Sequence, residues 1–263
     1  MNSSPPTTPP GPSTGTTYAA TAWEPYGRLL EHAEQGRPDA VASVLVSDGS
    51  VEEIAAYDLL RHGGFPDAEA FALEAARGRV LDLGAGAGPH SLALQERARL
   101  EAGSGLEVFA VDVCPQAVDV MRRRGVQHAE VATAETLLAR EPSLPPFDTL
   151  LLMMNGLGLA GTLDRLTPFL TRCRQLISPS GQILTDLASP AGISDAPNAA
   201  DPRPYPGEVK FQFLYDGLLG ASFPWLFLDP QTLRRHALRA GLQTQVVFSD
   251  GQGQYLVRMV PVV

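Results

Sequence analysis

One stretch decides the fold of this chain: Val80-Leu-Asp-Leu-Gly-Ala-Gly-Ala-Gly-Pro-His-Ser-Leu-Ala-Leu94. Its apolar beginning predicts a short buried strand. Glycines at positions 84, 86 and 88 break that strand, and Pro89 suits the first turn of a helix, where its missing N–H costs nothing. The stretch therefore predicts a strand, a glycine turn and a helix that begins directly after the turn.

The three alternate glycines have a physical purpose. Glycine lets the backbone turn sharply and lets a ligand lie against bare main chain. The N-terminus of the following helix offers free N–H groups and a partial positive charge, which favour an anionic group. Asp82 adds a carboxylate to an otherwise apolar strand, and such a carboxylate usually has a partner, often a ligand ammonium or backbone N–H groups. A tight turn without a ligand is the alternative interpretation.

A second predicted strand, Glu107–Asp112, ends in an acidic residue 28 positions after Gly84. In a βαβ unit, an acid at this place accepts hydrogen bonds from the ribose of a bound nucleoside. Asp112 also fits the N-cap of a helix before Pro115, and the two roles are compatible. The glycine spacing differs from the dinucleotide pattern Gly-x-Gly-x-x-Gly, because the third glycine, Gly88, comes one residue early.

The run Asp82-Leu-Gly-Ala-Gly-Ala-Gly88 resembles the first motif of class I S-adenosylmethionine-dependent methyltransferases. The resemblance extends roughly from Val80 to Leu187. It implies an α/β fold with a doubly wound, Rossmann-like sheet of seven strands, mostly parallel with an antiparallel C-terminal hairpin, and an N-terminal helical cap. It also implies S-adenosyl-L-methionine as the cofactor and methyl transfer as the activity.

The resemblance further implies which residues hold the cofactor. The glycine loop would hold the methionine half, Asp112 the ribose, and Val113 would border the adenine. The predicted strand that ends at Asn155 would place that residue beside the transferring methyl group. The implied cofactor-binding residues are Asp82, Gly84, Ala85, Gly86, Gly88, Asp112, Val113, Ala134, Glu135, Asn155 and Gly156.

Three residues are candidates for a catalytic role. In-line displacement at an activated methyl depends mostly on proximity and alignment, and a base is needed only if the acceptor carries a proton. Asn155 cannot take a proton, so we expect it to orient a ligand. His90, on the first turn of the loop helix, is a cofactor neighbour, the base or an ordinary surface histidine. Tyr57 is our candidate on the acceptor side, with plain packing as the alternative.

Outside the motif the chain divides into three parts. Residues 1–17 hold 15 Pro, Thr, Ser and Gly residues, and we expect them to be disordered. Residues 18–78 are predicted to form a helical cap, and residues 79–263 the methyltransferase domain. Five prolines in residues 190–207 indicate a lid or a plain mobile loop. Helices of the cap are expected at Tyr26–Gln35, Val51–His62 and Asp67–Arg77, with an ambiguous apolar run at Ala40–Ser47.

Periodicity and turn signals predict the remaining elements of the domain. The expected helices are Pro115–Arg124, Thr162–Ile177 and Gln231–Ala240. The expected strands are Val126–Val131, Pro146–Asn155, Gln182–Leu187, a hairpin of Glu208–Tyr215 with Ser222–Leu228, and a closing antiparallel pair of Gln243–Phe248 with Gln254–Val260.

Composition limits the partners and the compartment. The chain carries 20 basic and 29 acidic residues, a net charge of −9, which disfavours a nucleic-acid partner and favours a small-molecule acceptor. No apolar run approaches the ~20 residues that span a bilayer, and the N-terminus lacks the basic start and apolar core of a signal peptide. The two cysteines make no disulfide framework and the five histidines no metal motif, so we expect a cytoplasmic protein without a metal.

Two other functional classes stay open. A binding module could keep the cofactor site without transferring a methyl group, since the sequence assigns no definite base. A nicotinamide-dependent oxidoreductase could use the same kind of sheet, although the glycine spacing disfavours it.

Overall fold

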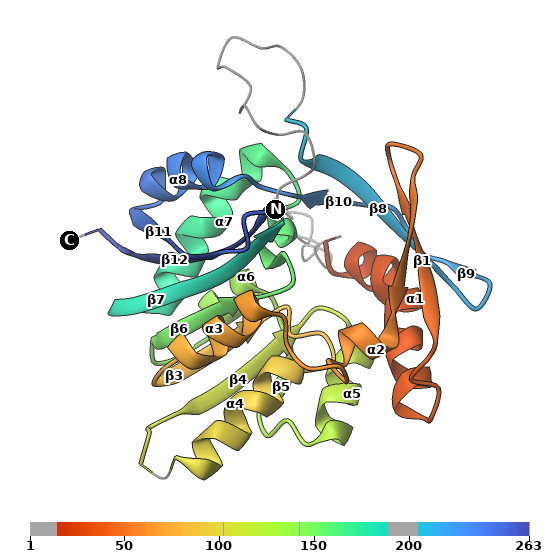
Figure 1. The fold of residues 1–263 in the computed structure, drawn as a ribbon, viewed down its shortest axis with the longest axis horizontal. Helices are drawn as coiled ribbons and strands as arrows, with labels where there is room; N and C mark the ends of the chain where they lie inside the picture. The colour runs from red at the N-terminus through yellow and green to blue at the C-terminus, as the bar shows by residue number, and fades with distance from the viewer. Residues whose placement is uncertain (1–14, 102, 142, 189–204, 263) are drawn as a thin grey trace, which may run out of the picture.

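A seven-stranded sheet forms the body of the molecule (Figure 1). The computed structural model describes residues 15–101, 103–141, 143–188 and 205–262. The strands are β3 Arg79–Leu83, β4 Glu107–Asp112, β5 Ala129–Val131, β6 Phe147–Leu152, β7 Ile177–Ala188, β11 Leu242–Ser249 and β12 Gln254–Pro261. Their order is β11-β12-β7-β6-β3-β4-β5, parallel from β7 to β5, with β12 antiparallel to β7 and β11. This arrangement confirms the predicted fold class.

Helices cover both faces of this sheet, which explains why its central strands are apolar throughout. Alternate residues of a strand point to opposite faces. Leu81 accordingly joins the core on one face, and Val80 the core on the other. The first face is covered by α6 Ala134–Leu138, α7 Leu163–Leu176 and α8 Pro230–Arg239, and the second by α3 Asp67–Ala75, α4 Pro89–Leu100 and α5 Pro115–Arg124.

A second, smaller sheet stands beside the first and is antiparallel throughout (Figure 1). Its strands are β1 Val41–Val46, β2 Val51–Ala55, β8 Glu208–Tyr215, β9 Leu218–Leu219 and β10 Phe223–Leu226. Their order is β10-β8-β1-β2, and β9 also pairs with β8. Helix α1, Gly15–Glu34, packs against both this sheet and α5, so it joins the small sheet to the main one.

One face of the second sheet is aromatic. Phe211 and Phe213 alternate along β8, and Phe223 and Trp225 alternate along β10. Phe211 and Phe223 are cross-strand partners, which places both pairs on the same face. Trp23 of α1 packs against this face, with its ring centroid 4.6 Å from that of Phe223. We call these five side chains the aromatic face.

The structure corrects the predicted helical cap in one place. Residues 51–62, predicted as a helix, form strand β2 followed by the short helix α2, Ala56–Leu59. The ambiguous run at 40–47 is strand β1, and the turn at Asp48-Gly49 joins the two strands in a hairpin. The hairpin forms because β1 also pairs with β8, a partner far along the chain that a local pattern does not reveal.

The remaining differences concern short elements that the sequence did not predict, such as helix α6 and the 3-10 helix Gly156–Ala160, and the ends of segments. Helix α1 begins at Gly15 rather than Tyr26, so residues 15–17 of the tail that we expected to be disordered are helical. Residues 1–14 of that tail, and residues 190–204 of the predicted lid, lie outside the described part of the chain.

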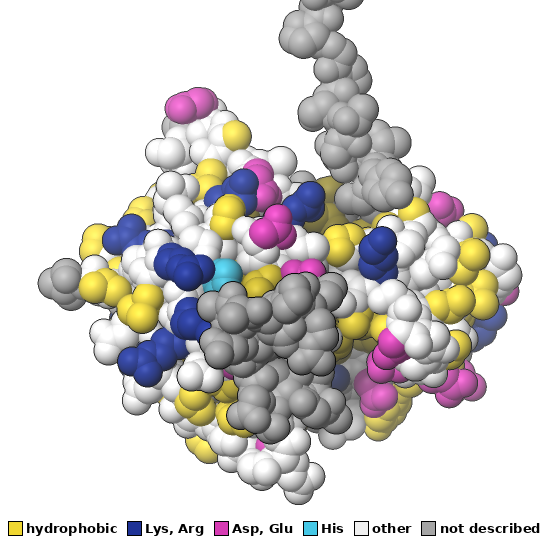
Figure 2. Space-filling model, turned by 90° about the horizontal axis from the view of Figure 1, so that it is seen from above, with side chains coloured by type: hydrophobic (Ala, Val, Ile, Leu, Met, Phe, Trp, Pro, Cys, Tyr) yellow, Lys and Arg dark blue, Asp and Glu magenta, His cyan; other side chains and the backbone are white. Residues whose placement is uncertain are grey.

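The surface carries charged side chains of both signs. On the face shown in Figure 2, several Lys and Arg side chains gather on the left among apolar and uncharged ones, and most acidic side chains lie at the top, in the centre and on the right. A helix long and apolar enough to cross a membrane is also absent from the described residues.

We expect α1 to belong to the cooperative core rather than to be a detachable arm. Leu30 is fully buried in a cluster with residues of α2, β1 and α5. Leu30→Ala should lower the free energy of unfolding by about 2–5 kcal/mol, because it removes buried methyl groups and leaves a cavity. Leu100→Ala, where the leucine is 67% exposed, is the matched control and should change it by less than about 0.5 kcal/mol. Urea unfolding followed by tryptophan fluorescence measures both, and equal effects would contradict this view of α1.

Candidate active site

The glycine turn after β3 is tied to the end of β4. The backbone N–H groups of Gly84 and Ala85 both donate to the carbonyl of Val111, at 2.9 and 3.0 Å. All three loop glycines have positive φ, a region that other residues adopt only with strain. At Gly86 a side chain is excluded for a second reason, because a Cβ there would lie 2.6 Å from the hydroxyl oxygen of Tyr26. The loop therefore presents bare backbone at a fixed place.

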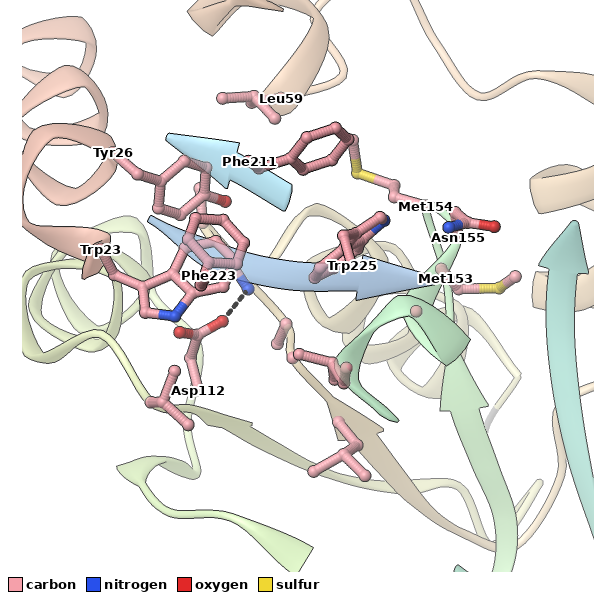
Figure 3. Close-up of a pocket in the computed structure, with 18 of the residues that line it drawn as sticks. Trp23, Tyr26, Leu59, Asp112, Met153, Met154, Asn155, Phe211, Phe223 and Trp225 are labelled. Carbon is pink, nitrogen blue, oxygen red and sulfur yellow. Dashed lines mark hydrogen bonds between the residues drawn. The ribbon is translucent and has the colours of Figure 1, made fainter. Parts of the chain in front are cut away.

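A cavity of about 500 Å³ lies between this loop and the aromatic face (Figure 3). Its volume falls within the ~300–1,000 Å³ typical of small-molecule sites. One wall is formed at the carboxyl ends of β3, β4 and β6, where open α/β sheets bind ligands. That wall includes Asp82, Gly84, Ala85, Gly86, His90, Asp112, Val113, Ala134, Glu135, Asn155 and Gly156, and the opposite wall includes Trp23, Tyr26, Glu52, Phe211, Phe213, Phe223 and Trp225.

Asp112 ends β4 with a buried carboxylate at the cavity (Figure 3). Its Oδ2 accepts a hydrogen bond from the N–H of Gly86 at 2.9 Å, and its Oδ1 accepts one from the N–H of Cys114 at 2.8 Å. Burial raises the pKa of this carboxyl, although the backbone donors act in the opposite direction. Because a carboxylate has about four lone-pair sites, Asp112 keeps the capacity to bind ligand hydroxyls.

Asp82 is the second buried carboxylate of this wall. It lies at the end of β3, and its Oδ2 accepts a hydrogen bond from the Ser91 hydroxyl at 2.7 Å. Burial raises the pKa of Asp82, and nearby His90 and Ser91 offset part of that effect. A buried carboxylate that is served by so few donors favours a cationic group beside it.

A buried ion-pair network holds His90 at the cavity. Its Nε2 lies 2.7 Å from Oε2 of Glu69, and Glu69 also accepts two hydrogen bonds from the Arg61 guanidinium. Burial raises the pKa of Glu69, but the bonds from His90 and Arg61 outweigh it, so the pKa lies below its ordinary value. Glu69 therefore stays ionised and fixes the imidazole ring, which leaves Nδ1 as the nitrogen available to another partner.

Asn155 follows β6 in a strained turn. Both Met154 and Asn155 have left-handed backbone conformations, with φ of 58° and 57°. The Asn155 N–H donates to Asp186 at 3.0 Å, and its Nδ2 donates to the carbonyl of Leu226 at 3.2 Å. Its Oδ1 is buried and accepts no hydrogen bond within the described part of the chain. These contacts fix the side chain at the junction of the main sheet and β10.

The adenine-side candidates are also placed on this wall. Val113, Ala134 and Glu135 all line the cavity. Thr133 is the N-cap of α6, and it exchanges hydrogen bonds with Thr136 in a capping box. This cap fixes the first turn of α6, where Ala134 and Glu135 sit.

The structure brings the predicted site residues together, with two exceptions. Gly88 caps α4 behind the cavity, and a Cβ there would lie 2.8 Å from Val126, so its place is against the helix layer. Tyr57 lies on α2, is 46% exposed, and packs against His62 rather than lining the cavity.

Tyr26 occupies the place that we had expected of Tyr57. Its hydroxyl lies against Gly86 and has no hydrogen-bond partner within the described residues. Burial raises the pKa of this hydroxyl well above its ordinary value, and Asp112 adds to the effect. A signal was present in the sequence, because Trp23 and Tyr26 are three residues apart and so share one helix face. The part of the protein that this helix face contacts depends on the second sheet.

The described residues support neither a metal site nor a reactive thiol. No group of three or more His, Cys, Asp or Glu side chains is arranged there to hold a metal ion. Burial raises the pKa of the Cys114 thiol to about 12, so it stays protonated and packs against α1.

The comparisons with known proteins place the chain in a family. A scan of protein-family models and a search of curated proteins both find no match. Among solved structures, a SAM-dependent methyltransferase from Bacteroides fragilis, in complex with S-adenosyl-L-homocysteine, is 31% identical. The match covers 94% of this chain and 97% of that chain, with a TM-score of 0.77. The chain belongs to the S-adenosylmethionine-dependent methyltransferases.

More distant structures show the same fold. A methyltransferase from Streptomyces caelestis is 18% identical, with 76% of this chain and 92% of that chain covered and a TM-score of 0.54. An amino pentose methyltransferase from Micromonospora echinaspora is 14% identical, with 80% and 98% covered and a TM-score of 0.55. Membership of the family confirms the prediction of S-adenosylmethionine as the cofactor of this methyltransferase.

A pH test follows from Asp186, which holds the backbone of Asn155. Burial raises the pKa of Asp186 from 3.8 to about 6. Because the folded pKa is the higher one, the folded state binds the proton more tightly, and the resulting stability is complete below pH 3.8 and is lost as the pH rises through about 6. The difference amounts to at most about 3 kcal/mol.

Asp186→Asn removes the titration and keeps an oxygen for the Asn155 N–H. The variant should match the natural protein in unfolding free energy near pH 4 and exceed it above pH 6.5, as measured by urea unfolding at each pH. Asp39→Asn, at an exposed carboxylate, should show no such change with pH. If the unfolding free energies of Asp186→Asn and the natural protein change with pH in parallel, the raised pKa of Asp186 is contradicted.

Proposed function

We propose that this methyltransferase transfers the methyl group of S-adenosylmethionine to a small molecule bound between the glycine loop and the aromatic face. The observation that carries the proposal is one cavity with two unlike walls. Bare backbone and buried carboxylates on one wall suit a nucleoside with an amino-acid tail. Aromatic side chains on the other wall suit a compact, largely apolar acceptor.

The residues of the polar wall fit the cofactor part by part. Asp112 would accept hydrogen bonds from the ribose hydroxyls, and Val113, Ala134 and Glu135 would surround the adenine. The glycine loop and the start of α4 would take the methionine carboxylate, since free N–H groups and the helix dipole favour an anion there. Asp82 supplies the buried negative charge that a methionine ammonium requires.

When bound, the cofactor supplies a methyl group on a positively charged sulfur atom. The protein's own contribution is alignment, because an in-line displacement depends on the distance and direction between the two reacting atoms. Asn155 is suited to this task, since two hydrogen bonds hold its side chain and backbone where the two walls meet. His90 is suited to take a proton on Nδ1, because Glu69 occupies its Nε2.

The size of the site supports a small acceptor. A folded nucleic acid would need a basic surface to neutralise its phosphates. The described charges seen in Figure 2 are mixed, and the chain as a whole is acidic.

Asp112→Ala tests the cofactor site. The variant should weaken binding of S-adenosylmethionine by about 1.5–3 kcal/mol for each charge-assisted ribose bond lost. It also removes the acceptor of the Gly86 and Cys114 N–H groups, so its unfolding must be measured in parallel and binding compared where it is fully folded. Asp119→Ala, at an exposed carboxylate of α5, is the control and should bind like the natural protein.

Calorimetry with S-adenosylmethionine, S-adenosylhomocysteine and NAD reports the affinities. An unchanged dissociation constant for Asp112→Ala would end the ribose assignment, and tighter binding of NAD would end the methyltransferase proposal. Detection of S-adenosylhomocysteine formed during turnover with a metabolite extract separates an enzyme from a binding module.

A further inference from the structure

The acceptor side of the cavity is built from aromatic rings. Trp23, Phe211, Phe213, Phe223 and Trp225 all line it, and their neighbouring centroids lie 4.6–6.3 Å apart. Figure 3 shows rings of Trp23, Phe211, Phe223 and Trp225 gathered on one side of the glycine loop, with Tyr26 beside them. We call this space the aromatic chamber. The faces of such rings carry negative potential and attract cations.

Apart from His90, which is paired with Glu69, the charged side chains around the cavity are acidic. Its described lining includes the carboxylates Glu52, Glu53, Asp82, Asp112 and Glu135, and none of the described residues that line it is Lys or Arg. Glu135 is paired with Arg172 outside the cavity, at 3.4 Å. Asp82 and Asp112 belong to the wall that the proposed function assigns to the cofactor. Of the five carboxylates, this leaves Glu52 and Glu53 of β2 without an assigned role. Neither is in an ion pair within the described residues.

The strand register places Glu52 with the aromatic chamber. Glu52 is the cross-strand partner of Val44, and Val44 is the partner of Phe213 on its other side. Directly opposed residues in an antiparallel sheet point to the same face. Glu52 therefore stands at the rim of the same face from which Phe213 projects, whereas Glu53 alternates with it along the strand.

This combination discriminates between classes of acceptor. A carboxylate or phosphate would enter without a basic side chain to pair with, next to unpaired negative charge, and that is costly. An alcohol or thiol would be tolerated, but it brings no positive charge to pair with the rim carboxylate or the ring faces. A small ammonium ion gains from both the ring faces and Glu52.

Resting on the function proposed above, we propose that the acceptor is a small molecule carrying a basic amine, and that the amine nitrogen receives the methyl group. The chamber holds the ammonium form, which loses one proton, through Nδ1 of His90, to solvent water and becomes the free base. The nitrogen lone pair then forms the N–C bond to the methyl carbon while the C–S bond breaks and its electron pair goes to sulfur. The sulfonium becomes a neutral thioether, and the product is a methylated ammonium, so charge and atoms balance.

Three probes of one skeleton test the charge preference: phenethylamine, 2-phenylethanol and phenylacetate. Each is titrated by calorimetry into the complex of the protein with S-adenosylhomocysteine. We expect phenethylamine to bind about tenfold more tightly than 2-phenylethanol, and phenylacetate to bind most weakly. Glu52→Gln should reduce the advantage of the amine about threefold to tenfold at low salt, and less at high salt, because the rim carboxylate is exposed to screening.

Glu74→Gln, an exposed position on α3 away from the cavity, is the matched control and should leave the ratio unchanged. The inference is overturned if the alcohol or the acid binds as tightly as the amine, if none of the three binds, or if Glu52→Gln leaves the ratio unchanged.

Transfer of labelled methyl groups from S-adenosylmethionine to an extract, followed by identification of the methylated atom, gives the second readout. We expect labelled N-methyl products. Label on oxygen, sulfur or carbon would refute the amine inference while the proposed function stands. Failure to bind S-adenosylmethionine at all would refute the proposed function itself, so the two failures are distinguishable.

Discussion

The hydrogen bond from the Gly86 N–H to the Asp112 carboxylate is the contact on which the site depends. It joins the two strand ends that meet at the cavity, and the bonds from Gly84 and Ala85 to the Val111 carbonyl reinforce it. A carboxylate buried in this way is stable only while N–H donors face it. The glycine loop must therefore hold its left-handed geometry, and the same geometry leaves the backbone bare for a ligand.

The second sheet supplies what the main sheet lacks. A doubly wound sheet binds ligands at the carboxyl ends of its strands, but those ends are open to solvent. Helix α1 and the small sheet close that side with aromatic side chains, and the cluster around Leu29 and Leu30 connects them to α5. Packing contacts outside the chamber therefore hold its aromatic wall in place, at a distance from the glycine loop.

The sequence predicted the parts of the site that local patterns determine. Strand, glycine turn and helix follow each other within fifteen residues, and the acid at the end of β4 is marked by its distance from Gly84. Val51–Ala55 was mistaken for helix because its partner strand β1 is held in turn by β8, which only the folded chain brings near. The same long-range pairing explains why Tyr26 rather than Tyr57 reaches the loop, since the position of α1 depends on that sheet.

The electrostatics of the two walls form one system. Burial raises the pKa of Asp82, Asp112 and Asp186 alike, which means that burial disfavours the ionised form of each carboxyl more than the protein's own donors stabilise it. A ligand that brings positive charge relieves this imbalance, and the cofactor brings a sulfonium and an ammonium. Methyl transfer turns the sulfonium into a neutral thioether, so the cofactor loses part of that attraction at the moment when the acceptor gains a methyl group. With an amine acceptor the positive charge moves across the cavity from sulfur to nitrogen, from the polar wall toward the ring faces and Glu52. The aromatic chamber then stabilises the charge that the reaction creates, which is the condition under which a binding surface also favours the transition state.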